Sequence, residues 1–435
     1  MGFFRNVATV FATSVARTPL GFLTGIVLAR WLSVSDRGLY ALLTTFSAIV
    51  FLLTQLGWAE AVIYRTRREG VSPRRALSTG VAANGAFALA AFALCWALRA
   101  PLSHAFLGDV SARAFLLAAA TAPLLTLGEL LCGVARTLDR FDLHNQFGFL
   151  QSLLILCLLV AALVFGGGAL DAALAVNLGV QAALVLVFGA RIAALAGIEW
   201  RVDLREALAS VRYGKNLYLQ NLLINLHERI DVLLLAALGV SAFDIGLYAA
   251  GVSVVAQLRQ VPGAIGTVLL PRLAGATQAE AAEFTATVVR PSLLVMLAAA
   301  LALAPAGAIG IPLLFGREYA PAVFPFLVLL PGVALVTVSR VLGRYFAAVN
   351  RQRAIVALRV AVLVLNVALN LWLIPRAGIV GAALASLLSY GIEAAATVAL
   401  FLADSGQAFR TALAPRASDF DDYLARLRGL LSRAR

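Results

Sequence analysis

Five arginines lie within long apolar stretches of the sequence, where a charged side chain is costly: Arg17, Arg30, Arg229, Arg259 and Arg340. Ionisable groups at membrane depth are rare, and they usually face a polar cavity or an oppositely charged partner. Arg17 and Arg259 each closely precede a proline, a residue that bends a helix and frees a backbone carbonyl. We therefore predict that these arginines are the ligand-binding residues of an internal polar cavity.

Other roles stay open for three of these arginines. Arg340 could lie near a membrane surface and extend its guanidinium into water. Arg30 and Arg229 could instead form ion pairs with Asp36 and Asp231.

Polar side chains also recur at a spacing of four residues, which places them on one helix face. Asn221 and Asn225 follow this spacing, and we predict that they contact the ligand; hydrogen bonding between membrane helices is the alternative. Three acidic residues, Glu60, Glu129 and Asp231, are candidates for carrying a coupling ion or proton, although each could simply neutralise an arginine.

The elements that must position these residues follow from the composition. Hydrophobic residues make up 62% of the 435 positions and charged residues 13%, and the mean hydropathy is +0.92. Soluble domains are about half apolar and about a quarter charged. The apolar runs show no period of two, which the strands of a membrane barrel would require. The chain is therefore predicted to be an all-α integral membrane protein.

About twelve transmembrane helices, in two halves of six, are predicted from the apolar runs. They cover residues 7–31, 38–64, 76–98, 113–136, 145–166, 169–193, 215–238, 244–272, 287–312, 321–346, 353–375 and 377–402. Arginine-rich segments follow the second, sixth and tenth spans, whereas the alternate loops carry little charge. The positive-inside rule then places the N and C termini in the cytoplasm, with Arg290 and Arg359 as anchors at the cytoplasmic surface.

A repeated motif supports the division into halves. The pattern Ser-x-x-Asp-x-Gly-Leu-Tyr-Ala begins at Ser33 and again at Ser241, 208 positions later. Both copies lie between the first two spans of their half, where the aspartate could cap the next helix and the glycine permit a tight entry. The halves are therefore predicted to share one topology, related by an axis along the membrane normal.

The predicted organisation has four parts. A six-helix lobe covers residues 1–200, a cytoplasmic interfacial linker 201–214, a second six-helix lobe 215–403, and a basic amphipathic cytoplasmic tail 404–435. The first helix of each lobe carries a polar stripe, so a central cavity between the lobes is expected.

Several short motifs occur in order along the chain: Leu28-Ala29-Arg30, Gly38-Leu39-Tyr40-Ala41, Arg229-Ile230-Asp231, Leu314-Phe315-Gly316 and Ala377-Gly378-Ile379-Val380-Gly381-Ala382-Ala383. In these motifs the sequence resembles the Wzx-type flippases of the multidrug/oligosaccharidyl-lipid/polysaccharide (MOP) exporter superfamily. The resemblance extends over nearly the whole chain up to residue 402. It implies a MATE-like fold of two six-helix halves.

The resemblance also implies a function. A Wzx-type flippase moves a polyprenyl-pyrophosphate-linked oligosaccharide, such as an undecaprenyl-pyrophosphate-linked glycan, across the bacterial inner membrane by alternating access. The final product would be a surface or secreted polysaccharide, such as the O-antigen of lipopolysaccharide. Membrane lipids and a polysaccharide polymerase or other assembly proteins are the implied partners. Guanidinium groups bind phosphate oxygens through paired hydrogen bonds, which fits the predicted arginines.

Other functions fit the sequence less well. The chain lacks the G-x-x-x-x-G-K-[ST] pattern of nucleotide-hydrolysing loops, and its three cysteines show no metal-ligand spacing. We therefore expect no enzyme activity, no cofactor and no metal site. Its basic residues lie between the spans, so we expect no nucleic-acid partner. A multidrug or organic-cation antiporter of the same superfamily is the main alternative, and a membrane glycosyltransferase or O-antigen ligase is a weaker one.

Overall fold

The computed structural model of the chain describes residues 2–108, 110–167, 169–197, 199, 203–258, 277–349 and 351–414, with the side chains of these except 2–15, 204 and 215–217. Arg259, a predicted ligand-binding residue, lies outside the described residues, as does most of the predicted tail. Within the described part the chain forms helices and no strand.

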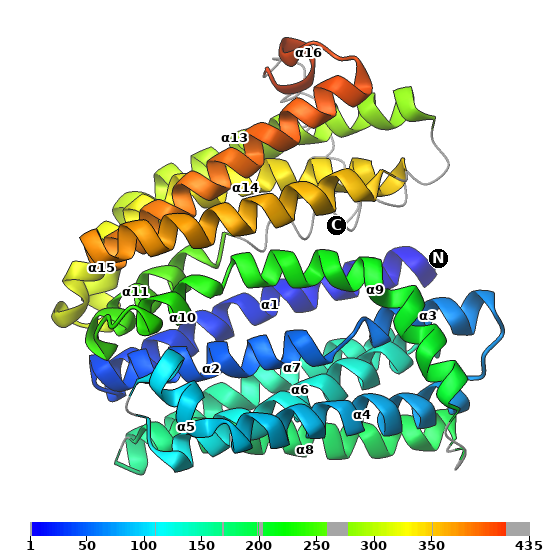
Figure 1. Cartoon of the computed structure of the whole chain (residues 1–435), viewed down its shortest axis with the longest axis horizontal. Helices are drawn as coiled ribbons and strands as arrows, with labels where there is room; N and C mark the ends of the chain where they lie inside the picture. The colour runs from blue at the N-terminus through cyan, green and yellow to red at the C-terminus, as the bar shows by residue number, and fades with distance from the viewer. Residues whose placement is uncertain are drawn as a thin grey trace, which may run out of the picture.

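The first half of the chain forms the helices that we call the N-lobe, in the lower part of Figure 1. They are α1 (Gly2–Trp31), α2 (Val34–Thr54), α3 (Trp58–Arg68), α4 (Pro73–Ala97), α5 (Arg99–Leu102), η1 (Ser103–Leu107), α6 (Ala112–Thr137), α7 (Phe141–Val160), η2 (Ala161–Phe165) and α8 (Leu170–Ala196).

The second half forms the C-lobe, whose helices α13 to α15 lie in the upper part of Figure 1. Its elements are α9 (Leu204–His227), α10 (Ile230–Ala237), α11 (Ala242–Val255), α13 (Gln278–Gly310), η3 (Ile311–Phe315), η4 (Arg317–Ala322), α14 (Val323–Ala348), α15 (Gln352–Ser405) and α16 (Phe409–Leu413).

Eight helical segments among the described residues are long and apolar enough to cross a membrane. The longest, α15, has 54 residues and turns back at Gly378, whose φ of 53° and ψ of −131° are not helical. A Cβ on Gly381 would lie 2.3 Å from the Leu373 carbonyl oxygen, so the two arms of α15 meet closely at this turn. Helix α15 therefore contains both of the spans predicted at 353–375 and 377–402. The all-α multi-pass membrane fold is confirmed, whereas the count of twelve spans and the position of the termini stay predictions.

The two copies of the sequence repeat begin α2 and α11 in the same way. Ser33 is the N-cap of α2: its hydroxyl oxygen accepts from the Asp36 N–H at 3.0 Å, and the hydroxyl donates to the Asp36 carboxylate at 2.8 Å. Ser241 and Asp244 repeat this geometry in α11 at 3.1 and 2.7 Å. The expectation that the aspartate itself caps the helix is wrong, because the serine three residues earlier has the extended backbone that a cap requires.

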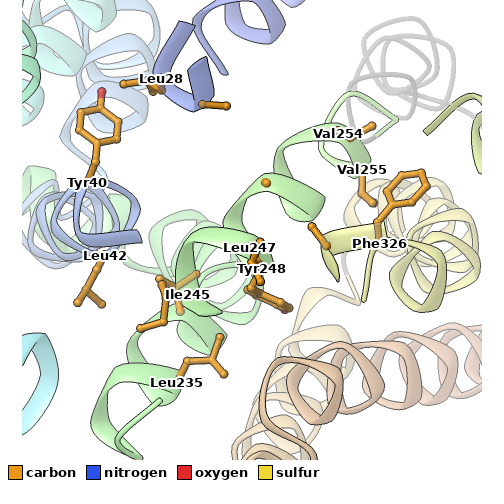
Figure 2. Close-up of a cluster of buried hydrophobic side chains, with 14 of the residues drawn as sticks. Leu28, Tyr40, Leu42, Leu235, Ile245, Leu247, Tyr248, Val254, Val255 and Phe326 are labelled. Carbon is orange, nitrogen blue, oxygen red and sulfur yellow. The ribbon is translucent and has the colours of Figure 1, made fainter. Parts of the chain in front are cut away.

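Among the described residues, buried hydrophobic residues join the two lobes most extensively at the end of the bundle where α2 and α11 begin, which we call the α2–α11 end. The largest cluster there contains Leu28 and Leu42 of the N-lobe together with Leu247 and Phe326 of the C-lobe (Figure 2). At the opposite, arginine-rich end, the described residues form two smaller clusters: one in the N-lobe, which also includes Ala207 of α9, and one in the C-lobe. The lobes are therefore held together chiefly at the α2–α11 end.

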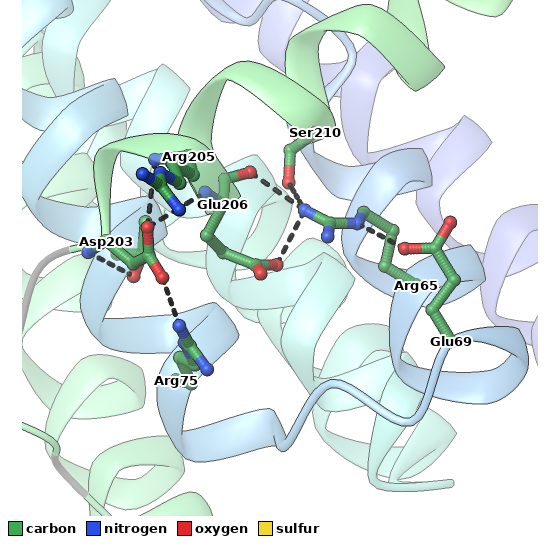
Figure 3. Close-up of polar contacts among 8 residues, drawn as sticks. Arg65, Glu69, Arg75, Asp203, Arg205, Glu206 and Ser210 are labelled. Carbon is green, nitrogen blue, oxygen red and sulfur yellow. Dashed lines mark hydrogen bonds and ion pairs between the residues drawn. The ribbon is translucent and has the colours of Figure 1, made fainter.

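Helix α9 connects the lobes and starts beside α3 of the N-lobe (Figure 1). Arg65 of α3 lies 2.7 Å from the Glu206 carboxylate and donates to the Glu206 carbonyl at 2.8 Å and the Ser210 hydroxyl at 3.2 Å (Figure 3). A Cβ on Gly214 would lie 2.6 Å from the Gly57 carbonyl oxygen, so α9 also crosses the start of α3 in close contact. The helix then continues without a break past the predicted end of the linker at residue 214.

The first turn of α9 is fixed by Asp203. Its carboxylate accepts from the N–H groups of Arg205 and Glu206 at 2.9 and 3.2 Å and pairs with the guanidinium of Arg75 in α4 (Figure 3). The Glu206 N–H and the Arg75 guanidinium hold the pKa of the Asp203 carboxyl below its usual value. The start of α9 is therefore fixed to the N-lobe, while α9 also packs against α15 of the C-lobe.

Candidate functional site

Arg17 projects from α1 toward α7. Its Nε donates to the Ser152 hydroxyl at 3.3 Å, and its guanidinium lies over Gly148, where a Cβ would come within 2.6 Å of an arginine nitrogen. The side chain is exposed, and no carboxylate among the described side chains lies within 4.0 Å of it. The glycine in α7 thus provides space for a cation whose charge is not neutralised by a neighbouring acid.

Arg340 lies on α14 of the C-lobe and forms an ion pair with Glu228, the residue that ends α9. Both side chains are about a fifth to a quarter exposed, at 24% and 20%. The Arg340 guanidinium therefore does not extend freely but lines a polar pocket with this carboxylate, and its depth in the membrane stays a prediction.

The same pocket contains a second arginine. Arg359 of α15 lies 3.8 Å from Glu393, and Glu393 lies 3.5 Å from Nδ1 of His227. The pocket has a volume of about 20 Å³, which is room for about one water molecule and not for a sugar. The expectation that Arg359 is an anchor at the membrane surface is wrong, since its side chain is 10% exposed and faces buried carboxylate and amide groups.

Asp231 lies deep in the C-lobe, where its side chain is 4% exposed. Its carboxylate accepts hydrogen bonds from the Tyr248 hydroxyl at 3.0 Å, the Asn370 amide at 3.0 Å and the Ser386 hydroxyl. All three of these donors are uncharged. They stabilise the carboxylate by hydrogen bonds without neutralising its negative charge.

A row of hydrogen bonds leads from this aspartate to the arginine-containing pocket. Asn370 donates to the Asn366 side chain at 3.2 Å, and Asn366 donates to the Ser389 hydroxyl at 3.1 Å. Ser389 in turn lies 3.0 Å from Nε2 of His227, whose other nitrogen faces Glu393. A continuous set of polar contacts therefore connects Asp231 with the pocket of Arg340 and Arg359.

The sequence-based list of site residues missed most of this row. Asn366 and Asn370 are four residues apart in α15, and Ser386, Ser389 and Glu393 follow at spacings of three and four. Each set therefore lies on one helix face, the signal that did identify Asn221 and Asn225. Nothing in the sequence showed that the two faces meet, because that depends on the turn of α15 at Gly378.

Several other predicted residues lie outside this row. Asn225 donates to the Asn221 carbonyl at 2.8 Å, a bond within their own helix. Glu129 lies 3.0 Å from Arg136 on its own helix, and Glu60 lies in the first turn of α3. The structure therefore places this acidic pair in the N-lobe, away from the C-lobe aspartate.

Arg30 and Arg229 lie on opposite sides of the lobe interface. Arg30, at the end of α1, donates to the carbonyl oxygens of Leu313 and of Leu314, the latter at 2.7 Å. The alternative of an ion pair between Arg30 and Asp36 is wrong, because the Asp36 carboxylate accepts the Ser33 hydroxyl instead. Arg229 is exposed between α9 and α10.

Arg290, the other predicted anchor, is 4% exposed and donates to the Thr411 carbonyl at 2.8 Å. It therefore fastens α16 to α13, and its position at the cytoplasmic surface stays a prediction.

Comparison with known proteins supports the membrane-transport fold. The family described as polysaccharide biosynthesis protein matches residues 27–324. No curated protein matches the chain in sequence.

Among solved structures, the chain is similar to the lipid II flippase MurJ in an inward closed conformation, with a TM-score of 0.68 and 13% identity over 91% of this chain and 90% of that one. It is similar to an inward-facing multidrug resistance transporter of the MATE family, with a TM-score of 0.67 and 14% identity over 91% of this chain and 99% of that one. A MOP superfamily transporter from Pyrococcus furiosus, described by a binding pocket of reverse polarity, has a TM-score of 0.59 and 13% identity over 93% and 95% of the two chains. These similarities confirm the expected MATE-like fold.

Proposed function

Because the chain belongs to the polysaccharide biosynthesis protein family and has the fold of the MOP exporters, we propose that it flips a polyprenyl-pyrophosphate-linked oligosaccharide across the bacterial inner membrane. Such a substrate joins a lipid to a glycan through two negatively charged phosphates. Moving this head group across a membrane requires a polar route with positive charge. One structural neighbour is itself named a flippase of lipid II.

The observation that carries the proposal is the set of arginines on both lobes. Arg17 has a guanidinium with no carboxylate partner among the described side chains, and Arg340 and Arg359 lie in the polar pocket of the opposite lobe. A guanidinium binds phosphate through two parallel hydrogen bonds. A pyrophosphate reaching Arg340 would compete with Glu228 for the same donors. Loading of the head group would therefore release a carboxylate and change the contacts that end α9.

The packing of the lobes supports transport by alternating access. Among the described residues, the lobes share their largest hydrophobic cluster at the α2–α11 end. At the arginine-rich end they have separate clusters, apart from α9, which packs into that of the N-lobe. The positive-inside rule assigns the arginine-rich end to the cytoplasm. This is the packing expected of a state that takes up substrate from the cytoplasmic side and is closed on the other side.

We further propose that Asp231 binds the coupling ion or proton. It is the buried acid of the C-lobe that is surrounded by neutral donors, and the hydrogen-bonded row connects it to the pocket of Arg340 and Arg359. Glu129 is a weaker candidate, because it already pairs with Arg136.

The test is leaflet exchange in liposomes of a fluorescent polyprenyl-pyrophosphate oligosaccharide. We expect rapid exchange with the unmodified protein and at least tenfold slower exchange with Arg17→Ala or Arg340→Ala. Arg113→Ala is the matched control, because Arg113 is 76% exposed and should leave exchange unchanged. Exchange that survives both substitutions would refute the arginine site. Uptake of an organic cation, without exchange of any glycan donor, would instead support the antiporter.

A further inference from the structure

Arg37 is buried at the α2–α11 end although it carries a full charge. Its side chain is 4% exposed, and its guanidinium donates to the Gly25 carbonyl at 2.8 Å and the Ser253 hydroxyl at 3.4 Å. The guanidinium carbon also lies 4.8 Å from the ring centre of Phe315 and 5.3 Å from that of Tyr319. A carbonyl, a hydroxyl and two aromatic faces therefore hold this cation.

None of these partners neutralises the charge. Among the described residues no carboxylate lies within 4.0 Å of the Arg37 guanidinium, and the neighbouring Asp36 is engaged by Ser33. Buried charges are normally paired with an opposite charge, because removing a lone ion from water is expensive. Arg37 is thus a buried cation available to any anion that can reach it.

A second arginine contacts the same part of the C-lobe. Arg30 donates to the carbonyl oxygens of Leu313 and Leu314, which directly precede Phe315 in η3. Two N-lobe cations therefore contact η3, and neither has an ion pair with a carboxylate among the described residues. Both contacts lie at the end where the lobes share their core.

Most of the Arg37 partners belong to the opposite lobe. Gly25 is on α1 of the N-lobe, whereas Ser253, Phe315 and Tyr319 are on α11, η3 and η4 of the C-lobe. If the lobes part at this end, Arg37 keeps one of these four contacts and Arg30 loses both of its carbonyls. The two guanidinium groups would then face the space opened between the lobes.

We propose that Arg37, together with Arg30, forms a second phosphate-binding position that exists only when the lobes part at the α2–α11 end. Its ligand is a phosphoryl group, either the pyrophosphate of the carried glycan lipid or the head group of an anionic lipid. The inference rests on the proposed function for the identity of the cargo, but binding of phosphate can be measured without transport. This position would bind the phosphate of the head group on the far side of the membrane. A phosphate held there would oppose closure of the lobes.

Opening at this end can be followed by spin labels at Trp31→Cys on α1 and Phe243→Cys on α11. Both native side chains are 43% exposed, and the three native cysteines would be replaced by serine. The full chain is placed in nanodiscs of zwitterionic lipid, with inorganic pyrophosphate as the probe. We expect pyrophosphate to increase the fraction with a long distance between the labels, and Arg37→Gln to raise the half-maximal concentration at least tenfold. Arg37→Lys should be intermediate, because it retains the charge and loses the forked donors.

A protein whose lobes are held apart by another substitution separates the role of Arg37 in binding phosphate from its role in keeping the lobes closed. A Cβ on Gly38 would lie 1.9 Å from the Ala242 carbonyl oxygen, and one on Gly246 would lie 2.0 Å from that of Val34. Gly38→Ala and Gly246→Ala should therefore each prevent full closure. In either background we expect Arg37→Gln to weaken pyrophosphate binding, measured by calorimetry, at least tenfold.

Arg317→Gln is the matched control, because Arg317 is an exposed arginine at the start of η4, beside the same contacts. Equal affinity with and without Arg37 in the opened protein would overturn the proposal, as would an α2–α11 end that stays closed in both glycine variants. These results would leave the flippase proposal standing, because that proposal depends on leaflet exchange and on Arg17 and Arg340.

Nanodiscs containing phosphatidylglycerol distinguish the two sources of phosphate. If a lipid head group occupies the site, the open fraction rises with this lipid alone and the apparent affinity for pyrophosphate falls. If the glycan lipid is the ligand, phosphatidylglycerol changes neither quantity. For the site to stand, Arg37→Gln must remove the effect of phosphatidylglycerol in the first case and the effect of pyrophosphate in the second.

Discussion

Gly38 of α2 and Gly246 of α11, equivalent positions of the sequence repeat, cross in direct contact. A Cβ on Gly38 would lie 2.8 Å from the Gly246 backbone nitrogen and 1.9 Å from the Ala242 carbonyl oxygen. Each glycine therefore allows the backbone of the other lobe to approach its own helix. The expectation that the glycine serves a tight entry before the helix is wrong, because both glycines lie inside their helices.

Alanine at either glycine should slow transport by hindering closure at the α2–α11 end. Overpacking a tight contact costs about 1–3 kcal/mol, and about 1.4 kcal/mol is a factor of ten in population. We expect leaflet exchange at least tenfold slower for Gly38→Ala and for Gly246→Ala. Gly179→Ala is the control, because a Cβ there meets no atom within 4 Å. An unchanged rate for both repeat variants would show that the crossing does not gate transport.

The Glu228–Arg340 pair should stabilise the junction of α9 and α14. Glu228→Gln removes a carboxylate from a partly buried arginine, and we expect a loss of about 1–3 kcal/mol, less than for a fully buried pair. Thermal unfolding in detergent measures it. The exchanged pair Glu228→Arg with Arg340→Glu should recover part of the loss. Arg140→Gln, which breaks an exposed pair with Asp142, should change stability by no more than about 1 kcal/mol; an equal loss in both variants would count against the proposed role of the junction.

The docking of α9 on the N-lobe should weaken in acid. The Asp203 carboxyl has a lowered pKa in the folded protein, so its contribution is present above its unfolded pKa of about 3.9 and is lost as the pH falls through the lower folded value. A spin label at Leu208→Cys, where the native side chain is 64% exposed, should therefore become more mobile below about pH 4. With Asp203→Asn this pH dependence should disappear. A mobility transition that persists in this variant would assign the effect to another group.

Asp231→Asn should separate ion coupling from substrate handling. Asparagine is similar in size, and its single carbonyl oxygen can still accept from the Tyr248 and Ser386 hydroxyls, so the lobe should remain folded. It cannot carry a negative charge, so we expect any stimulation of exchange by an ion gradient to fall at least tenfold. Exchange without a gradient should be little affected. Asp171→Asn, at an acid that is 31% exposed beside Arg113, is the control; full stimulation in Asp231→Asn would exclude this coupling site.

The sequence could identify candidate residues better than their partners. The sequence identified Arg340 and Asp231 as candidate site residues, because a charged side chain in an apolar run is costly and usually faces a polar cavity or a partner. The sequence predicts Arg359 as an anchor at the membrane surface, because its position along the chain does not reveal that Glu393 faces it. Arg37 was overlooked because it lies between the spans by sequence, where an arginine is ordinary. Its burial arises only when η3 and η4 of the other half cover it.

By itself, the sequence determined the membrane environment, the helical class and the repeat of two halves, because these depend on hydropathy and short-range patterns along one chain. The motifs also indicated the superfamily. Only the tertiary structure decided that Gly38 meets Gly246, that two faces of α15 form one polar row, and that Arg37 is buried without a counter-ion. Each of these depends on segments far apart in sequence being brought into contact, and hydropathy cannot specify which polar groups will then face each other.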